Sequence, residues 1–223
     1  MRSILITGCS SGIGLDAART LHARPGWRVF ATCRKEADAE RLRDEGMESF
    51  RLDYSDGASV RAALDEALAR APDSLVLLRV LAGLQEKAGD FEGALATLAR
   101  IVAVAPSDVE AWLRKGMLER TAGRPEDALV SLCRVYELDQ RAPALLVDIG
   151  GLELAGGDAE AAVASFEAAR AAGVRENALT LGLARAYALL GRVEDARTLL
   201  EGAPELGRAG EVLLEELAAD ALR

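Results

Sequence analysis

A glycine-rich segment near the N-terminus contains the residues best suited to chemistry. Gly8, Gly12 and Gly14 follow a short apolar run and precede residues whose apolar positions repeat with helical spacing. Glycine permits tight turns and close approach of the backbone to a ligand. The N–H groups at the start of a helix bind anions, phosphate in particular. The spacing therefore predicts a loop that holds the phosphates of a nucleotide.

Other reactive side chains are scarce and scattered. The chain has one histidine, His22, and three cysteines, Cys9, Cys33 and Cys133, in 223 residues. Zinc sites and disulfide frameworks need several such residues at close spacing. We therefore expect no metal site, no disulfide framework and no histidine-based catalysis.

The glycine-rich loop needs a strand before it and a helix after it. Apolar runs predict strands over 3–7, 27–33 and 48–52, and helical spacing predicts helices over about 13–24, 36–45 and 58–71. This order is strand, helix, strand, helix, strand. It places the glycines between the first strand and the first helix, as a dinucleotide-binding unit requires.

Three features together resemble the N-terminal part of the short-chain dehydrogenases/reductases. They are Thr-Gly-x-x-x-Gly-x-Gly, the basic Arg34 after the second strand, and Asp53 after the third. The resemblance implies a partial Rossmann unit, and Arg34 favours NADP over NAD because it suits a 2′-phosphate. It implies that the cofactor contacts Gly8, Ser10, Ser11, Gly12, Ile13, Gly14, Arg34, Asp53 and Tyr54.

The resemblance covers residues 2 to about 71 and lacks the family's catalytic residues. The family continues with Asn-Asn-Ala-Gly, a catalytic serine and Tyr-x-x-x-Lys, but Asn177 is the chain's only asparagine and no lysine lies at the corresponding place after a tyrosine. We therefore expect no catalytic residues.

The strands that would lie beside the first one are also missing. Without them Ile4, Leu5 and Ile6 would form an exposed apolar edge. We therefore expect this part to be covered by the repeats, to be covered by a second copy in a homodimer, or to remain loosely folded.

The C-terminal part is repetitive. Glycines recur at 89, 123, 157 and 191, and alanines recur at the same interval, at 94, 128, 162 and 196. The interval and the pattern resemble the tetratricopeptide repeat, whose period is about 34 residues. They predict a mainly α fold, an α-solenoid of four helical hairpins over 75–108, 109–142, 143–176 and 177–210. Residues 208–223 resemble a capping helix, with Val212, Leu213, Leu217 and Leu222 as its apolar positions.

Resemblance to this repeat family implies a concave groove, lined by the first helix of each hairpin, that binds a protein or peptide. By the family's positions the groove residues are Arg79, Glu86, Lys87, Glu110, Leu113, Met117, Arg120, Val147, Leu154, Leu181 and Arg185. The Lys/Asn pattern of arrays that clamp chaperone C-terminal carboxylates is absent, so that partner is not supported.

The helix expected over 58–71 satisfies both patterns. Pro72 lies one repeat period before Pro106, and Asp56 is placed to cap the helix. We therefore expect a dinucleotide-binding unit at 1–57, a shared junction at 58–74 and the repeats at 75–210. Such a junction suits a continuous fold, and equally a recombined or engineered one.

Charge and hydropathy narrow the classes of partner and compartment. The net charge is −9, and the whole excess lies in residues 72–223, which carry 16 basic and 25 acidic side chains. This argues against nucleic acid. No stretch has the roughly 18 apolar residues of a membrane span, and we expect a cytoplasmic protein.

The favoured function is a binding scaffold with an inactive half-domain. The alternatives are a cofactor-responsive adaptor, or an oxidoreductase completed by a partner chain.

Overall fold

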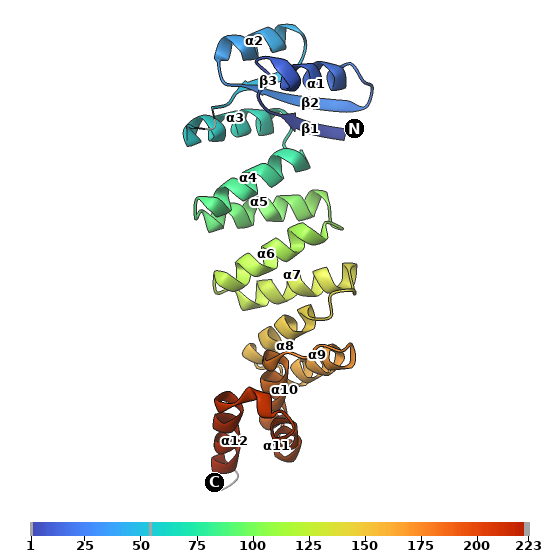
Figure 1. Cartoon of the computed structure of the whole chain (residues 1–223), viewed down its shortest axis with the longest axis vertical. Coiled ribbons are helices and arrows are strands. Elements are labelled where there is room, and N and C mark those ends of the chain that lie inside the picture. The colour runs from blue at the N-terminus through green and yellow to red at the C-terminus, as the bar shows by residue number, and fades with distance from the viewer. Residues whose placement is uncertain (1, 54, 221–223) are drawn as a thin grey trace. The chain divides into compact units, whose positions relative to one another are not determined.

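The computed structural model describes residues 2–53 and 55–220, which divide into two compact units (Figure 1). One unit extends to Asp108 and contains the sheet and the first helical hairpin. The other begins at Val109 and contains the remaining hairpins. The boundary thus lies within the predicted repeat array, between its first and second hairpins.

The first unit is built on a parallel sheet of three strands. These are β1 (Arg2–Ile6), β2 (Trp27–Cys33) and β3 (Glu48–Arg51), in the order β1-β2-β3. Ile4 is paired with Val29 and Thr32 with Phe50. β2 is central, and its residues from Val29 to Cys33 are all buried, as expected for a strand covered on both faces.

Helices cover both faces of this sheet. α1 (Gly12–His22) and α2 (Glu36–Asp44) lie on one face, and α3 (Gly57–Arg70) and α4 (Leu75–Lys87) lie on the other (Figure 1). The side chain of Asp56 caps α3 by accepting from the Ala58 N–H, as expected. The six elements predicted up to residue 71 are all present, with only small shifts at their ends.

The edge strand β1 is partly covered by other parts of the chain. Ile4, Leu5 and Ile6 are half-buried. Ile4 and Ile6 pack into the core beneath α1 and α2, and α4, the first helix of the first repeat, packs against β1 from the other face of the sheet. Of the alternatives left open for this edge, the structure has cover from a repeat helix. β1 remains an edge strand, since the sheet of the described residues has no strand on its other side.

Helical hairpins follow at the predicted period. The hairpins are α4 with α5 (Phe91–Val104), α6 (Val109–Thr121) with α7 (Pro125–Leu138), α8 (Leu145–Ala155) with α9 (Ala159–Ala171), and α10 (Asn177–Leu189) with α11 (Val193–Glu201). The four glycines that mark the period turn the chain with φ between 73° and 85°. The four alanines are fully buried at the contact between the helices, so the predicted fold class is confirmed.

A short 3-10 turn, η1 (Pro204–Leu206), leads to the last helix, α12 (Arg208–Asp220). Leu213 and Leu217 are buried in the core of the second unit, as expected for a capping helix. Val212, another apolar position of this helix, is 43% exposed. Leu222 lies outside the described residues.

Buried hydrogen bonds join the two helices of a hairpin at equivalent repeat positions. In the first hairpin the Thr97 hydroxyl donates to Gln85 Oε1 at 2.7 Å. At the same positions of the second hairpin, the Ser131 hydroxyl donates to Glu119 Oε2 at 2.6 Å. Lys115 forms an ion pair with Glu119 and neutralises that buried carboxylate.

Candidate functional site

The glycine-rich loop lies at the carboxyl end of β1 and leads directly into α1. Gly8 and Gly12 adopt φ values of 71° and 64°, which side chains disfavour. A Cβ on Gly14 would lie 2.6 Å from the Gly8 carbonyl oxygen, too close for any other residue without a shift. The sequence therefore needs glycine at these positions to pack the helix closely on the strand.

The start of α1 is suited to an anion. Ser11 is its N-cap but makes no side-chain capping hydrogen bond, and the first turn contains no acidic residue. The Ser10 carbonyl accepts from Arg41 Nη2 at 2.9 Å, which fixes the loop. Ile13 is 91% exposed beside the loop. The helix dipole and the backbone N–H groups at the start of α1 together favour a phosphate.

Arg34 and Asp53 lie just beyond the carboxyl ends of β2 and β3. The pKa of the Asp53 carboxyl is lowered, mainly because the Ser55 hydroxyl donates to it at 2.7 Å and the Ser55 N–H at 3.0 Å, and in part because Arg34 and Arg51 are nearby cations. Arg34 itself is exposed. The fold thus brings the loop, Arg34 and Asp53 to one edge of the sheet. Tyr54, the other predicted contact, lies outside the described residues.

The two cysteines of this unit are poor nucleophiles. Cys9 and Cys33 are fully buried, and burial raises the pKa of both thiols. A thiol with a raised pKa stays protonated at neutral pH. Among residues 2–53 and 55–220 no three histidine, cysteine or acidic side chains gather as a metal site.

The predicted groove residues are divided between the two units. In the first unit Arg79 forms an ion pair with Asp108, Glu86 is half-buried, and Lys87 is exposed at the end of α4. These three residues occupy the first helix of their hairpin, as predicted.

In the second unit the predicted groove residues line three adjoining hollows. The central hollow, of about 480 Å³, lies over α8 and is lined by Arg120, Val147, Leu154, Leu181 and Arg185 among others. A neighbouring hollow of about 340 Å³ is lined by Leu113 and Met117 and shares Val147 with the first. A third, of about 350 Å³, lies against α12 and shares Leu154 and Arg185. We call these connected hollows the groove; their linings do not include Glu110.

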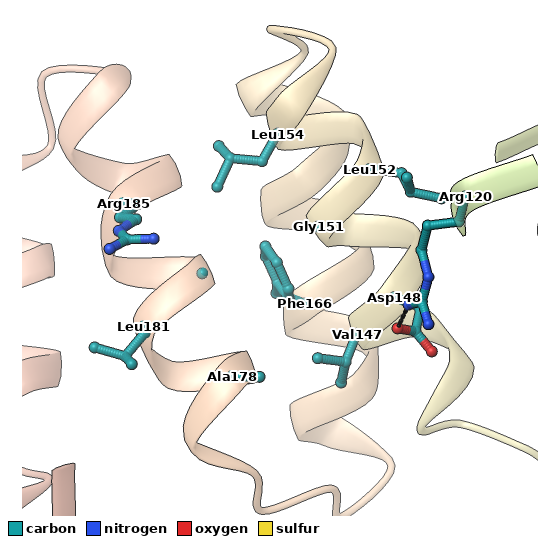
Figure 2. A pocket seen from close by; sticks show the side chains of 11 residues that line it. Arg120, Val147, Asp148, Gly151, Leu152, Leu154, Phe166, Ala178, Leu181 and Arg185 are labelled. Atoms are coloured by element: carbon teal, nitrogen blue, oxygen red, sulfur yellow. Dashed lines mark hydrogen bonds and ion pairs between the residues drawn. The ribbon is translucent and has the colours of Figure 1, made fainter. Parts of the chain in front are cut away.

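The walls of the groove are mostly apolar. Leu113, Met117 and Leu189, which line it, are 37%, 39% and 68% exposed. Figure 2 shows Val147 and Leu154 of α8 directed towards α10, with the Phe166 ring between the two helices. Apolar side chains exposed in a connected hollow are typical of a surface that binds another molecule.

The charged residues that line the groove are Arg120, Asp148, Glu176, Arg185 and Glu216. Arg120 Nη1 lies 2.5 Å from Asp148 Oδ1, and Figure 2 shows this ion pair on the side of α8 away from α10. Arg185 of α10 makes no ion pair with any residue that the structure describes. An arginine of this kind is available to a carboxylate or phosphate.

The sequence interpretation missed part of the groove. Leu189, Phe166 and Gly151 line it but were not predicted. Gly151 could have been found, because it occupies the same repeat position as Met117 and Arg185, which were both predicted. Phe166 could not, since it belongs to a second helix and reaches the groove only because Gly150 and Gly182 leave room for its ring.

Helices long and apolar enough to span a membrane are absent from the described part of the chain.

Two family profiles match the chain. The tetratricopeptide repeat profile matches residues 79–144 and 147–211, and the short chain dehydrogenase profile matches residues 2–109. The second match extends past residue 71, where the sequence interpretation ended the resemblance. In the structure, residues 75–108 of that range form the hairpin of α4 and α5 and contribute no strand.

Curated relatives are oxidoreductases much longer than their matched segments. "Uncharacterized oxidoreductase YbbO" of Escherichia coli (strain K12) is 40% identical over 100 residues, 44% of this chain and 35% of the relative. "Retinol dehydrogenase 16" of Homo sapiens is 46% identical over 63 residues, 27% of this chain and 20% of the relative. The chain thus spans about a third or less of the length of these relatives.

Solved structures of similar fold are repeat proteins. A crystal structure of MamA protein has a TM-score of 0.56 at 20% identity, covering 66% of this chain and 88% of MamA. YrrB, described as "a TPR protein with an unusual peptide-binding site", has a TM-score of 0.58 at 13% identity, covering 71% of this chain and 84% of YrrB. At these identities the likeness concerns the fold alone.

Proposed function

The chain belongs to the tetratricopeptide repeat family, and from this premise we propose that it is a scaffold that binds a segment of a partner protein in the groove. The observation that carries the proposal is the set of three adjoining hollows along α6, α8, α10 and α12. Of the groove residues predicted for the second unit, all but Glu110 line them. The peptide-binding site described for YrrB is consistent with this use of the fold.

The scaffold proposal is tested by placing a charge in the groove. Leu181 is half-buried on its wall, so Leu181→Asp should repel apolar segments while α10 remains folded. The matched control is Val130→Asp, since Val130 is 66% exposed on α7 and does not line the groove.

A phage-displayed library of random peptides, selected on the immobilised full chain, supplies the ligand for this test. We expect enriched peptides to bind the native chain and Val130→Asp alike, and Leu181→Asp at least about tenfold more weakly. Equal binding by all three proteins would contradict the scaffold proposal. The circular dichroism of each variant checks that its helices are intact.

The short-chain dehydrogenase-like segment before the repeats is, in our proposal, catalytically inactive. The tyrosine that donates the proton and the lysine that lowers its pKa have no counterparts in the chain. Incubation with NADPH and a panel of aldehydes and ketones should therefore show no cofactor oxidation above the rate without protein. Turnover that persists through repeated purification would overturn this proposal.

A second candidate function is binding of the adenosine-phosphate half of NADP. The positive φ angles of Gly8 and Gly12 and the absence of acidic residues in the first turn of α1 fit a phosphate. Arg34, exposed at the end of β2, fits a 2′-phosphate. The residues present therefore suit this part of the cofactor, which would bind through backbone N–H groups and one guanidinium.

Thermal unfolding with added nucleotide tests the second candidate. A ligand that binds only the folded state raises the melting temperature. At a ligand concentration a hundredfold above the dissociation constant, the folded state is stabilised by about 2.7 kcal/mol. We expect stabilisation by NADP to exceed that by NAD, and the difference to disappear in Arg34→Asp but not in the exposed control Arg24→Asp. No shift with millimolar NADP would refute the candidate.

A further inference from the structure

Gly151 is a glycine that the fold does not explain. It lies in the interior of α8, its φ is not positive, and a Cβ added there would contact nothing within 4 Å. Its neighbour Gly150 differs, because a Cβ there would lie 2.9 Å from the Phe166 ring. Glycine inside a helix destabilises it by about 1 kcal/mol relative to alanine. Packing and backbone geometry therefore give no reason for glycine at 151.

The place of Gly151 in the groove supplies a reason. The equivalent positions of the adjacent repeats hold Met117 and Arg185, whose side chains are long. Without a side chain at 151, the central hollow extends across the surface of α8. Figure 2 shows Gly151 on α8 with Arg120 to one side of it and Arg185 to the other. A ligand can thus reach the helix backbone at this point.

The charges around the hollow favour an acidic ligand. Arg120 is neutralised by Asp148, whereas Arg185 has no ion pair among the described residues. Two carboxylates, Glu176 and Glu216, line the adjoining hollows, and neither makes an ion pair with Arg185 among the described residues. Arg185 is therefore a local cation in a region whose net charge is negative, and a carboxylate is the group that complements it.

We propose that the groove binds a protein segment that lays a bulky apolar side chain over Gly151 and pairs an acidic side chain with Arg185. This inference rests on the proposed scaffold function and specifies its ligand. The carboxylate belongs to an internal aspartate or glutamate, because the hollows continue on both sides of the central one. The segment can pass through the groove and does not have to end in it.

Gly151→Leu separates binding from folding. Leucine has a high helix propensity and open space at this position, so the substitution should stabilise α8 while filling the hollow. The matched control is Ala164→Leu, which places a leucine side chain at an exposed position of α9 in the same repeat. The charge test is Arg185→Glu.

The peptides selected on the full chain serve as probes. We expect their consensus to contain a bulky apolar residue and, within a few positions, an aspartate or glutamate. A synthetic peptide with that consensus, measured by fluorescence anisotropy, should bind Gly151→Leu and Arg185→Glu about tenfold more weakly or worse. It should bind Ala164→Leu normally. A lysine in place of its acidic residue should restore binding to Arg185→Glu, and amidation of its C-terminus should change nothing.

Three results overturn the inference and leave the scaffold proposal intact. The first is that the peptides fail to bind Leu181→Asp yet bind Gly151→Leu and Arg185→Glu like the native chain. The second is a consensus without an acidic residue, and the third is binding that depends on a free C-terminal carboxylate. A selection that enriches no peptide at all contradicts both proposals.

Discussion

At the scale of single residues, the chain uses glycine for two opposite purposes. Gly14 brings α1 close to the turn after β1, where no side chain fits. Gly151 leaves open space on α8. The sequence predicted the role of Gly14, because the spacing of the loop glycines is typical of a dinucleotide-binding unit. It did not predict Gly151, although the repeat spacing places this residue at the position of Met117 and Arg185.

Gly14→Ala should destabilise the first unit. The added Cβ would lie 2.6 Å from the Gly8 oxygen and 2.9 Å from the Thr7 oxygen, and backbone atoms move only at a cost. We expect a loss of about 1–3 kcal/mol, the range for overpacking, measured by urea denaturation. Gly57→Ala is the control, since a Cβ at Gly57 would contact nothing within 4 Å. Equal stability of the two variants would contradict this interpretation.

Glu153 occupies the position of Glu119 one repeat later but has no lysine one helical turn before it, since Ile149 replaces Lys115. Its Oε2 is buried without a hydrogen-bond partner in the described part of the chain. Burial raises the pKa of the Glu153 carboxyl, Asp158 raises it slightly further, and Ser165 partly offsets the rise. Burial raises the pKa of the Cys133 thiol on α7, and the charge of Glu153 raises it further.

This glutamate should make the second unit less stable as pH rises. An acid whose pKa is higher in the folded state costs nothing while protonated in both states, below the ordinary glutamate pKa of about 4.3. The cost grows as pH rises through the folded-state pKa and is complete above it. Glu153→Gln should therefore be more stable than the native chain at pH 7 by up to about 1 kcal/mol. The difference should vanish near pH 4 in thermal unfolding; a constant difference would argue against titration of Glu153.

At the scale of elements, periodicity predicted what each segment forms but not what it packs against. The repeat period located each helix, and the glycine loop located the strands around it. The sequence predicted that another part of the chain could cover β1, but it did not identify α4, because this contact joins elements from two different family patterns. Gln85 and Thr97 recur one repeat later as the polar pair Glu119 and Ser131. Polar residues in a helix are usually interpreted as exposed, so this spacing did not predict a buried pair.

Thr97→Val tests the contribution of that pair to the first hairpin. Valine keeps the shape of threonine but leaves the Gln85 side chain, which is 6% exposed, without its hydrogen bond. An unsatisfied buried polar group costs about 1–3 kcal/mol. Hydrogen exchange of amides in α4 and α5 should report a loss of this size. The double variant Gln85→Leu/Thr97→Val should recover most of it, because both polar groups are then gone; no recovery would show that the hydrogen bond is not the cause.

At the scale of the whole molecule, the first unit combines half of one family's domain with the first hairpin of another's. The three strands and the helices α1 to α3 lie within about 70 residues, near the size at which a core becomes marginal. Here α4 supplies the additional layer, with Leu77 and Leu78 fully buried. The repeat helix therefore takes part in the fold of the short-chain dehydrogenase-like segment, and the compact unit ends at Asp108 and not at the junction helix.

Truncation should reveal this dependence. A fragment of residues 1–108 keeps α4 and α5 and should unfold cooperatively on heating. A fragment of residues 1–74 retains every strand and α1 to α3 but loses α4, and each buried leucine lost removes about 1.5–3 kcal/mol. With Leu77 and Leu78 both gone and β1 uncovered, we expect the shorter fragment to lose its cooperative transition and to bind the dye ANS, which reports exposed apolar surface. Calorimetry of both fragments decides the matter: if residues 1–74 melt as sharply and at the same temperature as residues 1–108, then α4 is dispensable, and the half-domain is stable without the repeats.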